Sequence, residues 1–298
     1  MENNSRNKRK IAVTGMSGML GRYLETELRK DRDVEIIPLL RDDYTLPSGV
    51  ETLYHLAGTE EEADAEEINL GLTKRLLRAA EQNLPRNLVI VSSWRVYPTD
   101  AGENVDERHN TWTPLEAGRT KAVAEMEAEK WAARTGVCLT IARPARMFGN
   151  GVHGDTQRLF DRVVRGHYVH IRDNKAMTSA VTALDCARAL VRLAGQPGIF
   201  NISDGRPATW EALVEAMGAN TGVRKRLIHL PVKWAKTIHA LFSFLPIVKE
   251  TVSPEALEPF SRTLTLDNSK VLQATGIEFH DTLAVIARED KTYPYDIE

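Results

Sequence analysis

The stretch that decides the fold is residues 13–21, which read Val13-Thr14-Gly15-Met16-Ser17-Gly18-Met19-Leu20-Gly21. It follows a short apolar run that is typical of a buried strand, residues 11–13. After it, Leu20, Leu24 and Leu28 recur at helical spacing, which predicts a helix from about Gly18 to Lys30. A strand, a turn with spaced glycines and a helix form the arrangement that holds a dinucleotide pyrophosphate.

Each glycine of this turn has a separate expected purpose. Gly15 permits the tight turn, Gly18 lets a phosphate approach the backbone, and Gly21 lets the helix pack closely on the strand. The free N–H groups at the start of the helix and their partial positive charge favour an anion there. We therefore predict that a dinucleotide binds to seven consecutive residues: Gly15, Met16, Ser17, Gly18, Met19, Leu20 and Gly21.

Short apolar runs alternate with helical patterns up to about residue 204. The predicted strands are 11–13, 34–40, 53–56, 88–91, 137–142 and 199–202, and the predicted helices are 18–30, 69–83, 120–134 and 185–194. This alternation indicates an α/β fold, a doubly wound parallel sheet of the Rossmann type. The segment from Val34 to Leu53 is too short for the helix that usually connects two such strands.

The expected domain organisation has two parts and a tail. Residues 10–149 and 179–204 form the dinucleotide-binding Rossmann domain, and residues 1–9 form a disordered tail. Residues 150–178 and 205–298 form a smaller, mostly helical, C-terminal substrate-binding lobe. Within this lobe, an apolar stripe at helical spacing is interpreted first as packing, with a membrane-surface or lipid-linked-substrate contact as the alternative. The stripe consists of Trp234, Ile238, Leu241, Phe242 and Leu245.

Composition excludes several classes of protein. The formal net charge of −2 argues against a nucleic-acid binder, which is usually strongly basic. The histidines have no metal-ligand spacing, so no metal is expected. Residues 1–10 lack the apolar segment of a signal peptide, and Pro231 to Lys249 is too charged and too short to span a bilayer. We therefore expect a cytoplasmic protein without a membrane span.

The end of the second strand normally selects between the two nicotinamide dinucleotides. It reads Leu40-Arg41-Asp42-Asp43 in this chain. An acidic residue such as Asp42 would hold the ribose hydroxyls of NAD, whereas Arg41 would hold the 2′-phosphate of NADP. Because both residues are present, the sequence predicts NAD or NADP without deciding between them.

Several further motifs follow the glycine turn in a familiar order. They are His55-Leu56-Ala57-Gly58, Ser92-Ser93-Trp94-Arg95-Val96-Tyr97, Gly118-Arg119-Thr120-Lys121, Arg143-Pro144 and Asp267-Asn268-Ser269-Lys270. With these motifs the chain resembles the extended short-chain dehydrogenase/reductase superfamily. Within it, the chain is most similar to the NAD-dependent epimerase/dehydratase branch, which acts on sugar nucleotides.

The resemblance implies roles for individual residues. Ser93 would hydrogen-bond the reacting oxygen, and Lys121 would hold the nicotinamide ribose and assist proton transfer. It adds Leu56, Ala57, Gly58, Ser92, Lys121 and Pro144 to the cofactor site. It also implies a homodimer through the helices at 69–83 and 120–134, and a nucleotide-linked sugar as the small-molecule substrate.

One residue departs from the family pattern. The family has a catalytic tyrosine four positions before its lysine, and that position is Ala117 here. Loss of a proton-transfer group typically lowers a rate by about 10²–10⁴-fold. Tyr97 is expected to pack or to line the substrate site, and Arg262 to replace the diphosphate-binding arginine that is absent at Thr178.

Three hypotheses remain open at this point. The chain is an NAD(P)-dependent epimerase, dehydratase or ketone reductase with an unusual proton path, or it is a non-catalytic NAD(P)-binding sensor or scaffold. As a third possibility, Ala117 is a deliberate replacement of a tyrosine.

Overall fold

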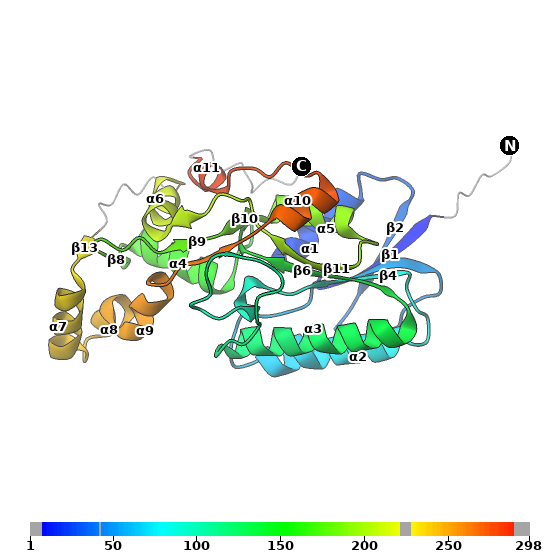
Figure 1. The fold of residues 1–298 in the computed structure, drawn as a ribbon, viewed down its shortest axis with the longest axis horizontal. Coiled ribbons are helices and arrows are strands. Elements are labelled where there is room, and N and C mark those ends of the chain that lie inside the picture. The colour runs from blue at the N-terminus through cyan, green and yellow to red at the C-terminus, as the bar shows by residue number, and fades with distance from the viewer. Residues whose placement is uncertain (1–7, 42, 221–227, 289–298) are drawn as a thin grey trace.

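A computed structural model describes residues 8–41, 43–220 and 228–288. Its centre is a parallel sheet of six strands in the order β11-β6-β4-β3-β1-β2 (Figure 1). The strands are β1 (Arg9–Thr14), β2 (Val34–Leu39), β3 (Val50–His55), β4 (Asn87–Val91), β6 (Cys138–Pro144) and β11 (Gly198–Ile202). The predicted doubly wound parallel sheet is therefore confirmed.

Helices cover both faces of this sheet, which explains why its strands read as continuous apolar runs. One face carries α1 (Met19–Leu28), α5 (Ala183–Leu193) and α10 (Ser269–Thr275), and α1 packs directly on α5 (Figure 1). The other face carries η1 (Glu66–Gly71), α2 (Leu72–Ala80) and α3 (Glu116–Thr135). Each face encloses its own apolar core, one around Leu24 and Leu190 and the other around Leu76 and Trp131.

The sheet reverses its winding between β1 and β3. The chain moves outward from β1 to β2, returns, and then continues on the opposite side of β1 with β3 and β4. Ligands of such folds bind at the carboxyl ends of the strands next to this reversal. Between β2 and β3 the described residues form only an isolated bridge, Leu40 with Asp43, so the predicted loss of the connecting helix is confirmed.

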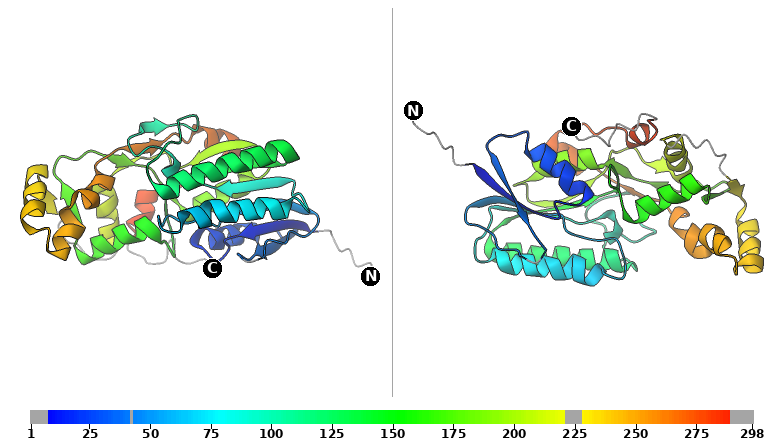
Figure 2. Two further views of the ribbon diagram at one scale, coloured as in Figure 1. Left: turned by 90° about the horizontal axis from the view of Figure 1, so that it is seen from below. Right: turned by 180° about the vertical axis from the view of Figure 1, so that it is seen from behind.

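The second lobe combines short helices with three small sheets (Figure 2). Its helices are α4 (Gly154–Arg165), α6 (Trp210–Asn220), α7 (Val232–Phe242), α8 (Pro246–Val252), α9 (Pro254–Leu257), η3 (Glu258–Phe260) and α11 (Thr282–Ile286). The small strands outside the six-stranded sheet are β7 (Arg146–Phe148), β8 (Val169–Ile171), β9 (Met177–Thr178), β10 (Ala180–Thr182), β12 (Ala208–Thr209), β13 (Ile228–Leu230) and β14 (Leu264–Leu266). Of these, β7 and β10 fall within the residues predicted for the Rossmann domain. Strand β5 (Gly102–Val105) joins β14 in one of these sheets, and η2 (Trp94–Val96) follows β4.

One expectation about the start of the chain needs correction. Arg9, placed in the tail, is instead the first residue of β1, where its guanidinium pairs with Asp31 at 2.6 Å and with Glu51 at 3.1 Å. Residues 1–7, the rest of the expected tail, lie outside the described part of the chain.

The packing expected for the apolar stripe on α7 is wrong. Within this helix Ala235 is buried, whereas the side chains of Trp234 and Leu241 are 64% and 62% exposed. Helix α7 contacts α8 at one tip of the molecule, and neither helix is covered by the core of the lobe (Figures 1 and 2). None of the helices in the described ranges is long and apolar enough to cross a bilayer.

Candidate functional site

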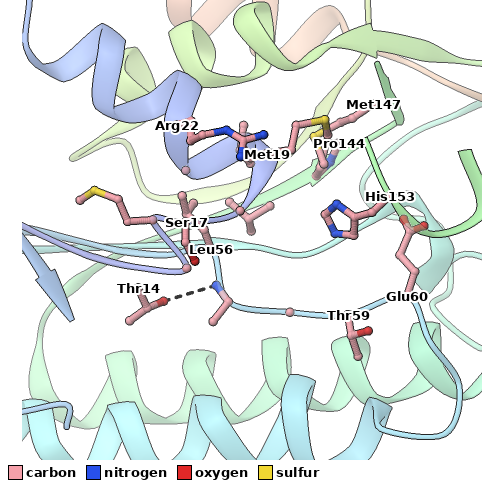
Figure 3. A pocket seen from close by; sticks show the side chains of 18 of the residues that line it. Thr14, Ser17, Met19, Arg22, Leu56, Thr59, Glu60, Pro144, Met147 and His153 are labelled. Carbon is pink, nitrogen blue, oxygen red and sulfur yellow. Dashed lines mark hydrogen bonds between the residues drawn. The ribbon is translucent and has the colours of Figure 1, made fainter. Parts of the chain in front are cut away.

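A cavity of about 640 Å³ lies at the carboxyl ends of β1, β3, β4 and β6. Its volume is within the range of cofactor sites, roughly 300–1,000 Å³. It brings together the whole glycine turn and most of the residues predicted from later motifs, which come from segments far apart in the sequence (Figure 3). These later residues are Arg41, Leu56, Ala57, Gly58, Ser92, Ser93, Lys121 and Pro144.

The glycine turn has the geometry of a phosphate cradle. Gly15 has a φ of +71°, and a Cβ atom added there would lie 2.8 Å from the backbone nitrogen of Ala57. A Cβ atom at Gly21 would lie 2.4 Å from the carbonyl oxygen of Gly15. Helix α1 starts after Gly18, whose position offers no side chain to cap the first N–H groups. These groups are thus available to an anion, so the cradle fits a dinucleotide pyrophosphate.

A buried hydrogen-bond chain fixes the floor of the cavity. The amide of Ala57 donates to the Thr14 hydroxyl, as drawn in Figure 3, and this hydroxyl lies 2.8 Å from Nδ1 of His55. On the other side of the ring, Nε2 lies 2.9 Å from the Thr73 hydroxyl, which itself donates to the carbonyl of Asn69. The chain is complete only when Nε2 carries the proton and Nδ1 accepts. His55 is therefore held neutral, and it ties β1 and β3 to α2.

Acid should weaken the fold through His55. Burial, and to a smaller extent the charge of Lys121, lower its pKa to about 3. Because the unfolded state, with a pKa near 6.5, takes up the proton first, the stability from neutral His55 is present above pH 6.5 and is lost as the pH falls towards 3. Between pH 7 and pH 5 the free energy of unfolding should fall by about 2 kcal/mol through this residue.

Chemical denaturation of the parent and of His55→Gln at both pH values measures this effect. All other titrating groups are shared by the two proteins, so the difference between their pH dependences isolates His55. The variant should lose less stability than the parent between pH 7 and pH 5. Equal losses in the two proteins would rule out His55 as the acid-sensitive group.

The predicted catalytic pair lies on one wall of the cavity. Ser93 follows β4, and its hydroxyl accepts a hydrogen bond from the backbone N–H of Arg95 at 3.2 Å. Lys121 comes from α3, and a Cβ atom added at Gly58 would lie 2.9 Å from its ammonium nitrogen. Burial lowers the pKa of Lys121, and the carboxylates of Glu60 and Glu125 partly oppose this. The pair thus sits beside the strand ends that border the glycine turn.

Asn69 positions this part of α3. Its side-chain amide donates to the carbonyl of Thr59 at 3.1 Å and to the Thr120 hydroxyl at 3.1 Å. Its carbonyl oxygen accepts from the amide of Thr59 at 2.8 Å. One buried side chain therefore joins the loop after β3 to the turn of α3 that precedes Lys121.

Ala117, at the position of the missing tyrosine, is fully buried in the first turn of α3. The segment after Ser93 packs closely on this turn, since a Cβ atom at Gly118 would clash with the carbonyl oxygen of Arg95 at 2.1 Å. Ala117 is not among the described residues that line the cavity. Position 117 therefore supplies no proton-transfer group.

The far end of the cavity holds charged residues that sequence motifs missed. Glu60 and His153 line it and lie at the same end in Figure 3. Glu60 Oε1 is 3.8 Å from Nε of Arg95, a buried arginine that also pairs with Asp155. A second buried arginine, Arg146, stacks on Trp94 and Trp210.

Arg146 is an unusual group to find in a protein interior. Burial lowers its pKa to about 10, and its Nε has no hydrogen-bond partner in the described structure. Its Nη1 lies 3.5 Å from the hydroxyl of Thr156, a residue that lines the cavity. A buried cation with a free donor next to a cavity is suited to an anionic group of a ligand.

Of the three residues predicted to bind substrate, Ser93 lines the cavity, whereas Tyr97 and Arg262 lie elsewhere. Tyr97 is 1% exposed, and its hydroxyl donates to Asn201 at 2.7 Å and accepts from Arg143 at 3.0 Å. Arg262 donates to the Thr99 hydroxyl at 2.9 Å and pairs with Glu258 at the surface. Both side chains are thus engaged by protein groups outside the cavity. Asp42, the predicted ribose ligand, lies outside the described residues.

The model of the NAD-dependent epimerase/dehydratase family matches residues 11–203, which include the whole glycine turn, Ser93 and Lys121. The chain belongs to that family. The resemblance inferred from the motifs is therefore confirmed, and the family's description agrees with the predicted NAD or NADP cofactor.

The curated relatives share between 25% and 30% of their residues with this chain over the matched regions. The N-acetyl-alpha-D-glucosaminyl-diphospho-ditrans,octacis-undecaprenol 4-epimerase of Escherichia coli O157:H7 is 25% identical over 214 residues, which cover 69% of this chain and 64% of that protein. Mouse (Mus musculus) short-chain dehydrogenase/reductase family 42E member 1 is 30% identical over 239 residues, which cover 66% of this chain and 59% of the relative. The chain thus matches about six tenths of each curated relative.

The fold is shared with a solved epimerase over nearly its full length. The structure of UDP-N-acetylglucosamine 4-epimerase from Bacillus cereus superposes with a TM-score of 0.74 at 21% identity. The superposition covers 98% of this chain and 99% of the Bacillus chain. At 21% identity this likeness shows that the two chains share a fold, and it shows no more than the fold.

Proposed function

We propose that this protein is an NAD(P)-dependent epimerase, dehydratase or ketone reductase that acts on a nucleotide-linked sugar. One observation carries the proposal: a single cavity joins the glycine turn to Ser93 and Lys121. A bound nicotinamide dinucleotide would supply a hydride acceptor or donor there. The solved complex of the protein MoeE5 with UDP-glucose and NAD supports this class of substrate. MoeE5 has a similar fold, with a TM-score of 0.70 at 21% identity, and the superposition covers 94% of this chain and 97% of that one.

The side chains of this protein would orient the sugar and move its proton. The Ser93 hydroxyl would hydrogen-bond the reacting sugar oxygen, and the Lys121 ammonium would hold the nicotinamide ribose. Position 117 offers no acceptor for the proton of the sugar hydroxyl, so another group has to take it. We assign this step to the carboxylate of Glu60, which lines the same cavity and acts electrostatically on Lys121.

The substrate diphosphate would bind beside Arg146. Arg146, buried beside Thr156 with its Nε free among the described residues, would replace Arg262 in this role. Its stacking on two tryptophans holds the guanidinium in a fixed position. We also propose a homodimer through α2 and α3, which lie side by side on one face of the sheet (Figure 1).

The competing function is a non-catalytic NAD(P)-binding sensor or scaffold. The observation that favours it is the buried Ala117 at the position where the family has its tyrosine. The two functions share the cofactor cradle, so cofactor binding does not separate them. Turnover of a sugar substrate does.

The test compares the activity of the parent with that of Ala117→Tyr. Each protein is incubated with UDP-linked sugars and either NAD or NADP, and the stereochemistry of the product is followed by NMR. We expect the parent to turn over a sugar and Ala117→Tyr to be no faster. Because position 117 is fully buried, the added phenol ring should also cost about 1–3 kcal/mol of stability through overpacking.

The control variant is Ser93→Ala, which should lose turnover while still binding the dinucleotide. Activity that arises only in the tyrosine form would mean that the parent lacks a base, and it would favour the binding protein. An inactive parent and an inactive variant across the sugar panel would overturn the proposed enzyme.

A further inference from the structure

Helices α7 and α8 carry an unusual amount of exposed apolar surface. Most of the large, exposed apolar side chains in the described ranges lie between Ile228 and Ile247. On α7, Trp234, Ile238 and Leu241 occupy one helical face, because their spacing is four and three residues, and Leu245 follows at the start of α8. Contiguous apolar surface of this kind marks a contact site for a partner or a membrane. We call these four residues, with Phe244 and Ile247, the α7–α8 surface.

The charged residues of α7 are two lysines, Lys233 and Lys236, and α8 carries Lys249 next to Glu250. Residues 216–249 contain no Asp or Glu, although the whole chain has 41 in 298 residues. The same stretch contains six Lys and Arg residues: Arg224, Lys225, Arg226, Lys233, Lys236 and Lys249. Lys233 and Lys236 are exposed on α7 itself, away from the apolar stripe. The partner of this surface is therefore expected to be both apolar and anionic.

Position and side-chain type narrow the partner further. The α7–α8 surface lies at the tip of the molecule opposite β1, where no other element of the described structure covers it (Figure 2). A helix with Trp and Leu on one face and Lys on the other is suited to lie in the plane of a bilayer. A second copy of this chain would bring a second cluster of positive charge, which opposes self-association.

We propose that the α7–α8 surface docks on an anionic lipid bilayer. Trp234, Leu241 and Phe244 would enter the boundary between headgroups and acyl chains, while Lys233 and Lys236 would contact lipid phosphates. The protein would lie on the membrane through its second lobe, since none of the helices among the described residues could span it. The α2–α3 face of the sheet lies on another side of the molecule, so docking leaves it free (Figure 1).

Vesicle flotation with the full chain tests this docking. The probes are vesicles of phosphatidylcholine alone and of phosphatidylcholine with about one third phosphatidylglycerol. The parent should float with the anionic vesicles, and its partition coefficient should be about tenfold lower on neutral vesicles and in high salt. Trp234→Ser with Leu241→Ser should reduce flotation about tenfold or more, as should Lys233→Glu with Lys236→Glu.

Both pairs of substituted side chains are exposed, so the variants should keep the parent's circular dichroism and melting temperature. The matched control is Trp112→Ser with Leu84→Ser, which removes two exposed apolar side chains outside the surface and should float like the parent. Failure of the parent to float, or equal flotation by all variants, would overturn the proposal. A third outcome would also overturn it: Trp234→Ser with Leu241→Ser lowers the molecular mass measured by light scattering but leaves flotation unchanged. That result would identify a second copy of this chain as the partner.

Discussion

Gly21→Ala is expected to open the glycine turn and to abolish dinucleotide binding. The added methyl group would lie 2.4 Å from the carbonyl oxygen of Gly15 and 2.5 Å from that of Met16. Both neighbours are backbone atoms, so neither can rotate away. Overpacking of this kind should lower the free energy of unfolding by about 3 kcal/mol. Because the displaced N–H groups are the ones that face the phosphates, the Kd for NADH or NADPH should rise about 100-fold or more.

Gly18→Ala is the matched control in the same turn. Its added Cβ would have one close neighbour, the Gly15 carbonyl oxygen at 3.3 Å, and its backbone is extended, with a φ of −71°. Stability should therefore change by less than about 0.5 kcal/mol, whereas the methyl group should still weaken the approach of a phosphate. Denaturant titration and fluorescence binding measure both quantities. Parent-like stability and affinity in Gly21→Ala would contradict the assigned cradle.

The glycine turn could be predicted because all its determinants are local. Residues 13–21 contain the strand end, the turn and the helix start, and the apolar runs that follow fix the order of strands and helices. Ser93 and Lys121, which were singled out from local patterns at fixed offsets from a strand or helix end, both line the cavity. The small strands of the second lobe, two or three residues long, are too short to show a period of alternation.

Of the two places expected for Tyr97, the structure has the packed one, because its environment is set by distant residues. It follows Ser93 closely, which made a place in the cavity plausible. However, its partners Arg143 and Asn201 are 46 and 104 residues away, and Arg143 in turn pairs with Glu125. A buried polar network of this kind has no signature in the residues next to Tyr97 in sequence.

The charged end of the cavity escaped prediction for a related reason. Glu60, Arg95 and Arg146 come from three separate segments and meet only in the folded chain. Glu60 begins an acidic run that reads as a solvated helix start. Arg146 is the first residue of a short strand and stands between Ala145 and Met147 in sequence. The one signal in the sequence was an arginine between apolar neighbours, which indicates a buried position. Arginine is rarely buried without a function or a partner.

The function of this end of the cavity can be tested at Glu60. If its carboxylate accepts the proton of the sugar hydroxyl, Glu60→Gln should lower kcat by about 10²–10⁴-fold, because the amide is nearly isosteric and cannot act as a base. The Kd of the dinucleotide should stay the same, since the glycine turn and Lys121 are unchanged. Steady-state kinetics on a UDP-linked sugar and a separate cofactor titration measure the two effects.

Glu61→Gln is the control for this experiment. Glu61 is the adjacent carboxylate, but it is exposed, pairs with Arg158 at 2.6 Å and lies outside the cavity. Exposed pairs contribute little, about 0–1 kcal/mol, so its loss should leave kcat within about twofold. A Glu60→Gln protein that keeps the parent's kcat would exclude this carboxylate as the base. A large fall confined to Glu60→Gln would identify this carboxylate as the group that takes the proton, in place of a residue at position 117.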